Sequence, residues 1–270
     1  MRKLAFSTNA FKKRTLEEAV STIRDAGYAG IEILADVPHA YPYSFDAAER
    51  SRLRALLDSS GLAVSNVNAF TLFAQGDTYH PSWIEADRAK RVAFTLEAIQ
   101  LTKDIGGVCL STEPGGPYEG DREPLMKLFA AGLKEVLPAA EAAGVQLLVE
   151  PEPRLLIERS SEMLALFDLV QSPALGVNFD IGHFHCVGER PAEAFRTLSP
   201  WVRHVHVEDI ADRRHFHLIP GKGEIDFGEF FSAADEMGYT GFFTVELYTY
   251  EQTPEEACRI AMDFLARFAT

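Results

Sequence analysis

Short apolar runs and longer amphipathic segments alternate along the chain. An apolar run of about four to eight residues between turn residues is typical of a strand buried on both faces of a parallel sheet. The run from Leu175 to Phe179, which Pro173 precedes and Gly182 follows, is the clearest case. Similar runs predict strands at 3–6, 31–34, 62–67 and 108–111, and strands ending at Glu150, Asp180, His206 and Glu246. The pattern therefore predicts eight strands.

The amphipathic segments between these strands predict helices. Their expected ranges are 15–26, 44 or 46–61, 82–105, 122–143, 160–170, 191–198, 227–237 and a last helix from residue 253. Thr15 and Glu18 form a capping-box pattern, and Thr253 and Pro254 suit the start of the last helix. Pro138 is expected to kink or break the fourth helix. Eight strand–helix units in 270 residues predict one domain over residues 1–270, an α/β fold of the (β/α)8 TIM barrel type.

The connections between the predicted elements differ in length. Long ones follow strands, at 68–81, 112–121 and 208–226, whereas those that follow helices mostly have two to four residues. In a TIM barrel the active site lies on the face where the strands end. The long connections are therefore expected to surround an active site.

Polar residues that can bind a cation stand at the ends of the last four predicted strands. Glu150, Asp180, His206 and Glu246 are 30, 26 and 40 residues apart, about one strand–helix repeat each. In a closed barrel these side chains would converge. Three carboxylates and one imidazole suit one divalent ion, Mn²⁺ first, with Mg²⁺, Co²⁺ or Zn²⁺ as alternatives, and exclude thiolate-rich zinc chemistry. The alternative is salt bridges to lysine, but no lysine stands at a strand end and Lys222 is the nearest in a loop.

Histidines cluster in the same part of the chain, where six of the eight fall between His183 and His217. His204 and His206 share one face of the predicted seventh strand, so the strand register decides which of them reaches the mouth of the barrel. His183 follows Asp180 by three residues on the turn that leaves the strand. We therefore expect His183 to face the substrate and to leave the ion to the other four residues.

Composition narrows the function classes. The net charge of −14 disfavours a nucleic-acid partner, which needs clustered Lys and Arg. No apolar run approaches the roughly 20 residues of a membrane helix, and the start of the chain has no hydrophobic targeting core. The three cysteines show no C-x-x-C spacing, which favours a reduced cytoplasm. We expect a cytoplasmic protein without membrane or nucleic-acid partners. The oligomeric state is open, with a homo-oligomer as one option.

Several short motifs together resemble one known superfamily. They are Glu150-Pro151, Asp180-Ile181-Gly182-His183, His204 to Asp209, Pro220 to Phe227 and Val245-Glu246. With these motifs the whole chain resembles the xylose-isomerase-like barrels, the sugar phosphate isomerases and epimerases that include ketose 3-epimerases, hydroxypyruvate isomerases and inosose dehydratases. The resemblance implies that Glu150, Asp180, His206 and Glu246 bind one divalent metal ion. It also implies that Glu150 and Glu246 move protons on opposite faces of the substrate, and that His183 binds substrate oxygens.

Two positions depart from the epimerase pattern. His217 stands near the place of an arginine, and Leu156 replaces a substrate-binding glutamate. Glu152, Arg154 and Glu158 are nearby substitutes for that glutamate. In the 208–226 loop, Arg214 and His217 are further candidate substrate contacts, because such a loop can serve as a lid over oxygen-rich ligands. The alternative is a solvated connection.

The expected activity is that of a metal-dependent isomerase or epimerase for a small sugar or sugar phosphate. The ion would polarise a carbonyl, a glutamate would remove the neighbouring proton, and the ion would hold the enediolate. The main alternative is a lyase or dehydratase for keto-sugars or 3-keto-glycosides on the same metal site. A non-catalytic sugar-binding barrel is less favoured.

A nuclease of the endonuclease IV type is also disfavoured. That relative adds histidines at the third and fourth strand ends, where this chain has Asn66, Asn68, Thr112 and Glu113. The segment His215-Phe216-His217 resembles its third-zinc motif only faintly, and we discount it.

Overall fold

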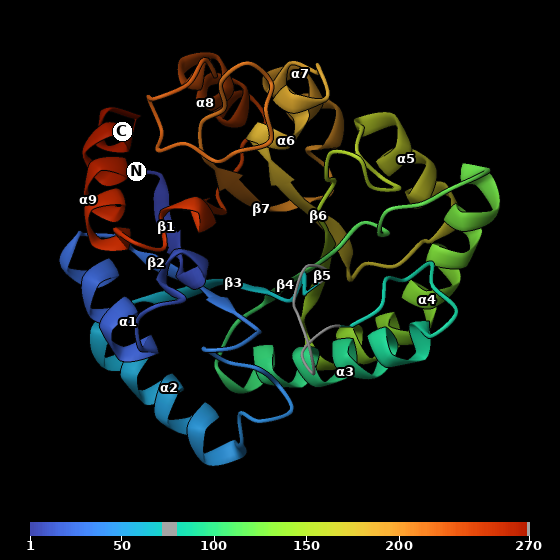
Figure 1. Ribbon diagram of the computed structural model, residues 1–270, viewed down its shortest axis with the longest axis horizontal. Coiled ribbons are helices and arrows are strands. Elements are labelled where there is room, and N and C mark those ends of the chain that lie inside the picture. The colour runs from blue at the N-terminus through green and yellow to red at the C-terminus, as the bar shows by residue number, and fades with distance from the viewer. Residues whose placement is uncertain (72–79, 269–270) are drawn as a thin grey trace.

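A closed barrel of eight parallel strands forms the centre of the protein (Figure 1). The computed structural model describes residues 1–71 and 80–268. Each strand pairs with its neighbours in chain order, and β8 closes the barrel on β1. The strands are β1 Lys3–Ser7, β2 Gly30–Leu34, β3 Ala63–Asn68, β4 Cys109–Thr112, β5 Gln146–Val149, β6 Leu175–Asp180, β7 Val202–Val207 and β8 Phe242–Val245. The predicted TIM barrel and its eight strands are confirmed.

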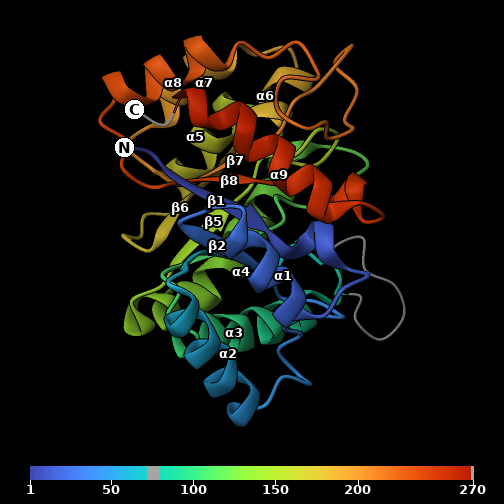
Figure 2. The ribbon, with the colours of Figure 1, turned by 90° about the vertical axis from the view of Figure 1, so that its left-hand side faces the viewer.

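Helices surround the barrel (Figures 1 and 2), and Arg2, near the start of the chain, donates a hydrogen bond to the backbone oxygen of Phe268. The α-helices are α1 Leu16–Asp25, α2 Ala47–Ser60, α3 Arg88–Asp104, α4 Arg122–Ala143, α5 Ser160–Leu169, α6 Ile181–Cys186, α7 Pro191–Leu198, α8 Phe227–Glu236 and α9 Pro254–Leu265. Short 3-10 helices are η1 Thr8–Phe11, η3 Tyr248–Tyr250 and η4 Ala266–Phe268. Burial of apolar side chains between this ring and the barrel is the main stabilising contribution.

Local signals at helix starts were mostly reliable. The capping box of Thr15 and Glu18 is present in both directions. Asp46, rather than Ser44, caps α2, because its side chain accepts the backbone N–H of Glu49. Pro254 occupies the first turn of α9 as predicted, but the side chain of Thr253 makes no cap hydrogen bond.

Two predictions about helices were wrong, and a third was wrong in part. The third helix begins at Arg88 and not at 82, because Ser82 and Trp83 donate hydrogen bonds to the buried carboxylate of Glu113. Residues 83–87 form turns and a bend. Pro138 does not break α4, which runs through it, and the kink expected as the alternative remains a prediction. The segment after β6 is a helix, α6, and not a turn, because Asp180 accepts the backbone N–H of His183 at its first turn.

The inside of the barrel is polar towards the strand ends. The hydroxyl groups of Thr244 in β8 and Ser65 in β3 are hydrogen-bonded at 3.1 Å, and strands that are not neighbours can meet only across the interior. Buried polar side chains of this kind are stable only when they are hydrogen-bonded. The barrel interior near the strand ends is therefore filled by a network of hydrogen-bonded polar side chains.

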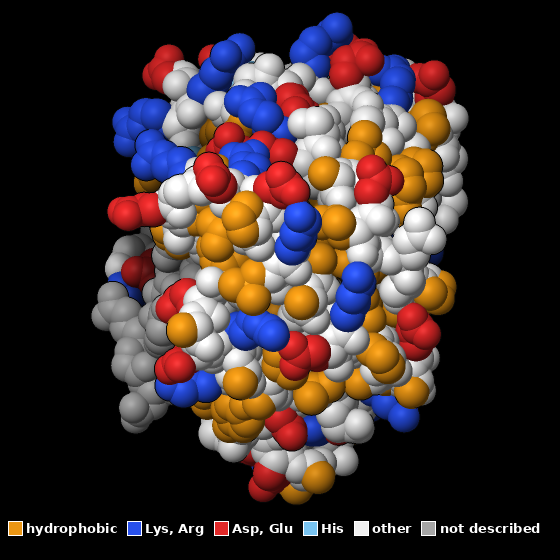
Figure 3. Space-filling model, turned by 90° about the vertical axis from the view of Figure 1, so that its right-hand side faces the viewer, with side chains coloured by type: hydrophobic (Ala, Val, Ile, Leu, Met, Phe, Trp, Pro, Cys, Tyr) orange, Lys and Arg blue, Asp and Glu red, His pale blue; other side chains and the backbone are white. Residues whose placement is uncertain are grey.

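The outer surface carries mixed charges. On the face shown in Figure 3, Lys and Arg side chains alternate with Asp and Glu, and hydrophobic side chains lie between them. Among the described residues, no helix is long and apolar enough to cross a membrane. Most of the predicted 68–81 connection lies outside the described residues.

Candidate active site

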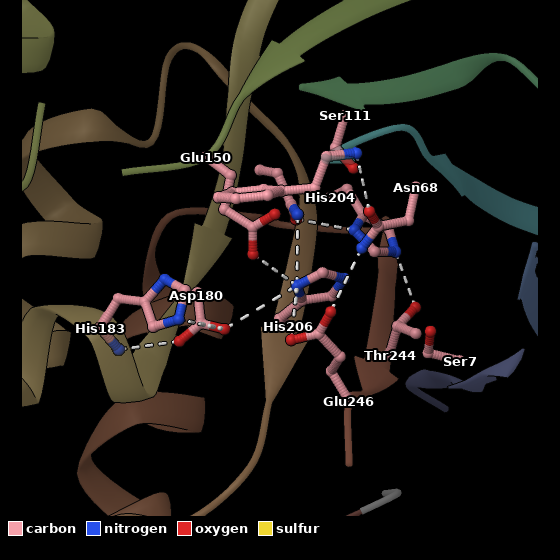
Figure 4. A network of polar contacts seen from close by, with 12 residues as sticks. Ser7, Asn68, Ser111, Glu150, Asp180, His183, His204, His206, Thr244 and Glu246 are labelled. Carbon is pink, nitrogen blue, oxygen red and sulfur yellow. Dashed lines mark hydrogen bonds and ion pairs between the residues drawn. The ribbon is translucent and has the colours of Figure 1, made fainter. Parts of the chain in front are cut away.

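The four predicted metal ligands converge at the mouth of the barrel (Figure 4). Glu150 directly follows β5, Asp180 ends β6, His206 lies in β7 and Glu246 directly follows β8. One ligand atom from each lies within 4.8 Å of the others, and all four residues are buried. Parallel strands in a barrel bring their carboxyl ends to one place, which is why residues up to 96 positions apart in the sequence meet here.

The ring of His206 has two different surroundings. Its Nδ1 atom lies 2.7 Å from Glu150 Oε1, 3.7 Å from Glu246 Oε2 and 3.8 Å from Asp180 Oδ2. Nε2 lies 2.7 Å from Glu32 Oε2 instead. Nδ1 is therefore the ring nitrogen that faces the three candidate carboxylate ligands, and it is the one that could share an ion with them.

Two carboxylate oxygens in this group have no hydrogen-bond partner although they are buried, Glu150 Oε2 and Asp180 Oδ2. Within residues 1–71 and 80–268, the ion pairs of Glu150, Asp180 and Glu246 are all with histidine and none is with Lys or Arg. Buried anionic oxygens without a donor or a cation are costly. The donor set and these open oxygens fit a divalent cation, and the lysine salt bridges considered as the alternative do not form.

The protonation of the site reflects the crowding of charge. Burial raises the pKa of Glu150, and it raises the pKa of Glu246 further. Burial alone would lower the pKa of His206, but the charges of Glu32, Glu150 and Glu246 together raise it well above its usual value. Without a cation, the site therefore holds protons that a metal ion would have to displace.

The register of β7 separates its two histidines. His204 is satisfied at both ring nitrogens, by Asn178 Oδ1 at 2.8 Å and Thr244 Oγ1 at 2.7 Å. Burial lowers the pKa of His204 to about 3, so it is a neutral interior residue. His206, two residues further along the strand, is the one that reaches the carboxylates.

The predicted substrate residue His183 lies beside the ligand group. Its Nδ1 lies 2.9 Å from the carbonyl oxygen of Pro151, which can only accept, so Nδ1 carries the proton. Nε2 then presents a lone pair, is buried, and has no hydrogen-bond partner. Its nearest neighbours are Glu152 Oε2 at 3.5 Å and Asp180 Oδ2 at 3.6 Å. His183 and Glu152 are thus both placed where a hydroxyl group of a ligand could bind.

Comparisons with known proteins place this geometry in one family. The family model for the xylose isomerase-like TIM barrel matches residues 20–268. The chain belongs to the xylose isomerase-like TIM barrel family. The resemblance inferred from the motifs is thereby confirmed.

Individual relatives of this family are similar over nearly the whole chain. A fructoselysine 3-epimerase of Shigella flexneri is 26% identical over 97% of this chain and 96% of its own length. An inosose dehydratase of Serratia proteamaculans is 25% identical, over 90% of this chain and 85% of its own length. A solved L-ribulose 3-epimerase structure superposes with a TM-score of 0.81 at 22% identity, over 99% of this chain and 93% of that one.

In this member of the family, His217 lies at the site, whereas the two predicted arginines have exposed side chains. The Nδ1 atom of His217 lies 3.0 Å from the backbone oxygen of Glu246, and its buried Nε2 has no partner. The side chains of Arg154 and Arg214 are exposed, and no hydrogen bond among the described residues joins either of them to the candidate ligands. Their predicted contact with a substrate remains a prediction.

The base of the 208–226 loop is closed by one of the loop's own carboxylates, Asp209. Asp209 Oδ2 accepts the backbone N–H groups of Gly221 and Gly223, and Oδ1 accepts those of Ile210 and Ile225. A Cβ atom at Gly223 would overlap Asp209 and the Ile210 backbone, so the turn requires glycine there. The loop thus has a fixed base, and its role as a lid remains a prediction.

The two histidines of the motif that resembles the third-zinc motif of endonuclease IV lie close together, beside His183. His183, His215 and His217 each offer a nitrogen within 4.8 Å of the others. The other nuclease positions are engaged elsewhere: Asn66 donates to Glu32 and Asn68 donates to Glu246. The amides therefore serve as hydrogen-bond donors to carboxylates.

Several residues of the site were missed by sequence reasoning. Glu32, Glu208, Asn9 and Asn68 are buried and contact the candidate ligands or their neighbours. Glu208 accepts the N–H of Gly182 at 2.7 Å, and a Cβ atom at that glycine would overlap the carboxylate. A glutamate in the middle of the apolar run 30–34 was the available signal for Glu32.

Proposed function

We propose that this chain is a divalent-metal-dependent isomerase or epimerase of a small sugar or sugar phosphate. The observation that carries the proposal is the convergence of Glu150, Asp180, His206 and Glu246, with two buried carboxylate oxygens unpartnered. The names of the relatives, sugar epimerases and inosose dehydratases, support the same class of substrate.

Glu150, Asp180, Nδ1 of His206 and Glu246 would hold the ion. A bound divalent ion supplies electrophilic catalysis, because it polarises a carbonyl group and so acidifies the neighbouring C–H. Mn²⁺ suits three carboxylates and one imidazole best, and Mg²⁺, Co²⁺ and Zn²⁺ are tested beside it.

The protein's own groups would move the proton. Glu150 and Glu246 approach from β5 and β8, which are three strands apart around the barrel mouth, so they can reach a substrate from different sides. One carboxylate removes the proton next to the carbonyl, and the other returns a proton to the opposite face. Nε2 of His183 would accept a hydrogen bond from a substrate hydroxyl and fix its orientation.

A dehydratase or lyase is the second candidate. It is favoured by the similarity to an inosose dehydratase over 90% of this chain. The first step is the same proton abstraction, after which a β-substituent leaves and the returned proton goes to that leaving group. The two candidates therefore share the residues and differ in the substrate.

The test measures proton abstraction whichever product forms. Metal-free protein is loaded in turn with Mn²⁺, Mg²⁺, Co²⁺ or Zn²⁺ and incubated in D₂O with ketoses, ketose phosphates, amino-ketoses, keto-inositols and 3-keto-glycosides. We expect metal-dependent deuterium incorporation next to one carbonyl by NMR, with an epimer, an isomer or an elimination product. Tight metal binding without exchange on any substrate would favour a non-catalytic sugar-binding barrel.

A further inference from the structure

A further carboxylate, outside the four candidate ligands, contacts one of them, His206, from the opposite side of the barrel. Glu32 lies in β2 and is fully buried. Its Oε2 atom lies 2.7 Å from Nε2 of His206, the ring nitrogen that faces away from the other carboxylates. We infer that Glu32 is a positioning residue, which orients His206 so that Nδ1 binds the metal and strengthens that nitrogen as a ligand. The inference rests on the metal site of the proposed function and adds a residue to it.

The geometry of the imidazole supports this division. With the Nε2–H donated to Glu32, the neutral ring has its lone pair on Nδ1. Nδ1 is the atom that lies within 3.8 Å of Glu150, Asp180 and Glu246. A histidine ligand that donates its second N–H to a carboxylate keeps its orientation and becomes more basic. Glu32 therefore selects the tautomer that the ligand group requires.

Glu32 is itself held firmly in place by three strands. The hydroxyl of Ser7 from β1 donates to Oε1 at 2.6 Å, and Nδ2 of Asn66 from β3 donates to Oε2 at 2.8 Å. Asn66 is fixed in turn by Ser111 of β4 at 2.9 Å. Donors of this kind stabilise the ionised carboxylate. The carboxylate cannot turn away from His206 without losing its donors.

The stability of the fold does not explain why a charged side chain is buried at Glu32. Among the described residues its ion pairs are with His206 and His204 only, and none is with Lys or Arg. A buried ion pair often contributes less to stability than a well-packed apolar replacement. His204 shows that the fold can satisfy a buried histidine with the neutral partners Asn178 and Thr244. The carboxylate at His206 is therefore best explained by its effect on the nitrogen at the other end of the ring.

The test compares two buried glutamates by the same substitution. Glu32→Gln keeps the shape and removes the charge. Glu113→Gln is the matched control, because Glu113 is equally buried and accepts hydrogen bonds from Ser82, Trp83 and Gly115, without touching His206. Metal-free full-length protein is titrated with Mn²⁺ and with Co²⁺, and the visible spectrum of the Co²⁺ form reports on the strength of its ligands.

We expect Glu32→Gln to weaken Mn²⁺ binding by about 10- to 100-fold and to shift the Co²⁺ spectrum, and Glu113→Gln to change neither. Ser7→Ala, which removes one donor to Glu32, should weaken binding by a few fold and covers the case in which Glu32→Gln does not fold. Unchanged affinity and spectrum in the folded Glu32 variant, or in Ser7→Ala should that variant not fold, would overturn the inference. So would equal losses in Glu32→Gln and Glu113→Gln. If the wild type binds neither ion, the proposed metal site itself is refuted. If the wild type binds an ion and the Glu32 variant binds it equally well, only the role of Glu32 is refuted.

Discussion

The two halves of the barrel contribute different chemistry to one site. The ends of β5 to β8 supply the candidate ligands, three carboxylates and an imidazole. The ends of β1 to β4 supply mainly neutral donors: Asn9 and Asn68 to Glu246, and Ser7 and Asn66 to Glu32. The C-terminal half is thus suited to hold a cation, and the N-terminal half to hold the groups that would bind it.

This difference explains how a net-acidic site can exist inside a barrel. Amide and hydroxyl donors stabilise a carboxylate without competing for a cation, whereas a lysine would neutralise the site. Among the described residues, Glu246 Oε1 receives two amide donors, while its Oε2 faces His206 and His217. The amide donors thus fix Oε1 of Glu246, and Oε2 is left to bind a ligand. Variants in each half of the barrel can test whether the two halves differ in this way.

The largest effect is expected from removing two charges of the C-terminal half. The double variant Glu150→Gln, Asp180→Asn preserves side-chain shape but removes two of the three anionic ligands. We expect Mn²⁺ affinity to fall by more than about 100-fold, beyond the loss expected for an outer-shell residue. Elemental analysis and titration measure the loss. Glu152→Gln is the control, a nearby carboxylate that should leave occupancy unchanged; a double variant that keeps its metal would refute the ligand assignment.

The pH dependence of metal binding should be steep. The pKa values of Glu150 and Glu246 are raised by burial, and that of His206 is raised by its carboxylate neighbours, so the metal-free site retains protons above about pH 6.5, the ordinary imidazole value. Binding must release these protons, so affinity should rise with pH by about tenfold per unit for each proton displaced. Calorimetry in buffers of different ionisation enthalpy counts the protons. An affinity that is flat from about pH 6 to 8 would show that the ligands are already deprotonated.

The same contrast between halves separates what the sequence reveals from what it does not. Glu150, Asp180 and Glu246 stood out because each stands at the end of an apolar run, and the strand repeat predicted that they would converge. Amides and hydroxyls occur at any loop or strand end, so Asn9 and Asn68 gave no signal. Only the folded barrel brings Asn9 and Glu246, 237 residues apart, to 2.8 Å.

The sequence analysis missed Glu32 and misplaced the start of α3 for a related reason. Glu32 lies inside a strand that was correctly predicted, but its partner His206 is 174 residues away. Residues 82–87 have a helical pattern, but contacts to Glu113, on a distant strand end, override it. Hydrophobic periodicity shows which face of a helix or strand is buried, but it does not show which polar group from elsewhere in the chain contacts that face.

A smaller effect on metal binding but a large one on turnover is expected at His183. Its Nε2 has no partner and faces the space beside Asp180. We expect His183→Ala to keep Mn²⁺ affinity within about threefold while kcat/KM falls by about 100-fold, the loss typical of a misplaced substrate. His206→Ala, in contrast, should lose the metal. Equal metal loss in both variants would show that His183 is a ligand and that the division of roles is wrong.

The smallest effect tests the neutral half directly. Asn9→Ala removes the shorter of the two amide donors to Glu246, 2.8 Å against 3.2 Å for Asn68. A net hydrogen bond is worth about 1 kcal/mol, so kcat should fall by about fivefold. The donor stabilises the ionised carboxylate, and its loss should raise the pKa of Glu246 further and move the acidic limb of the kcat–pH profile to higher pH. Metal affinity should stay within about threefold of wild type. An unmoved acidic limb would mean that Asn9 does not act through Glu246, and metal loss as large as that of the double variant would mean that the N-terminal half holds the ion as directly as the C-terminal half does.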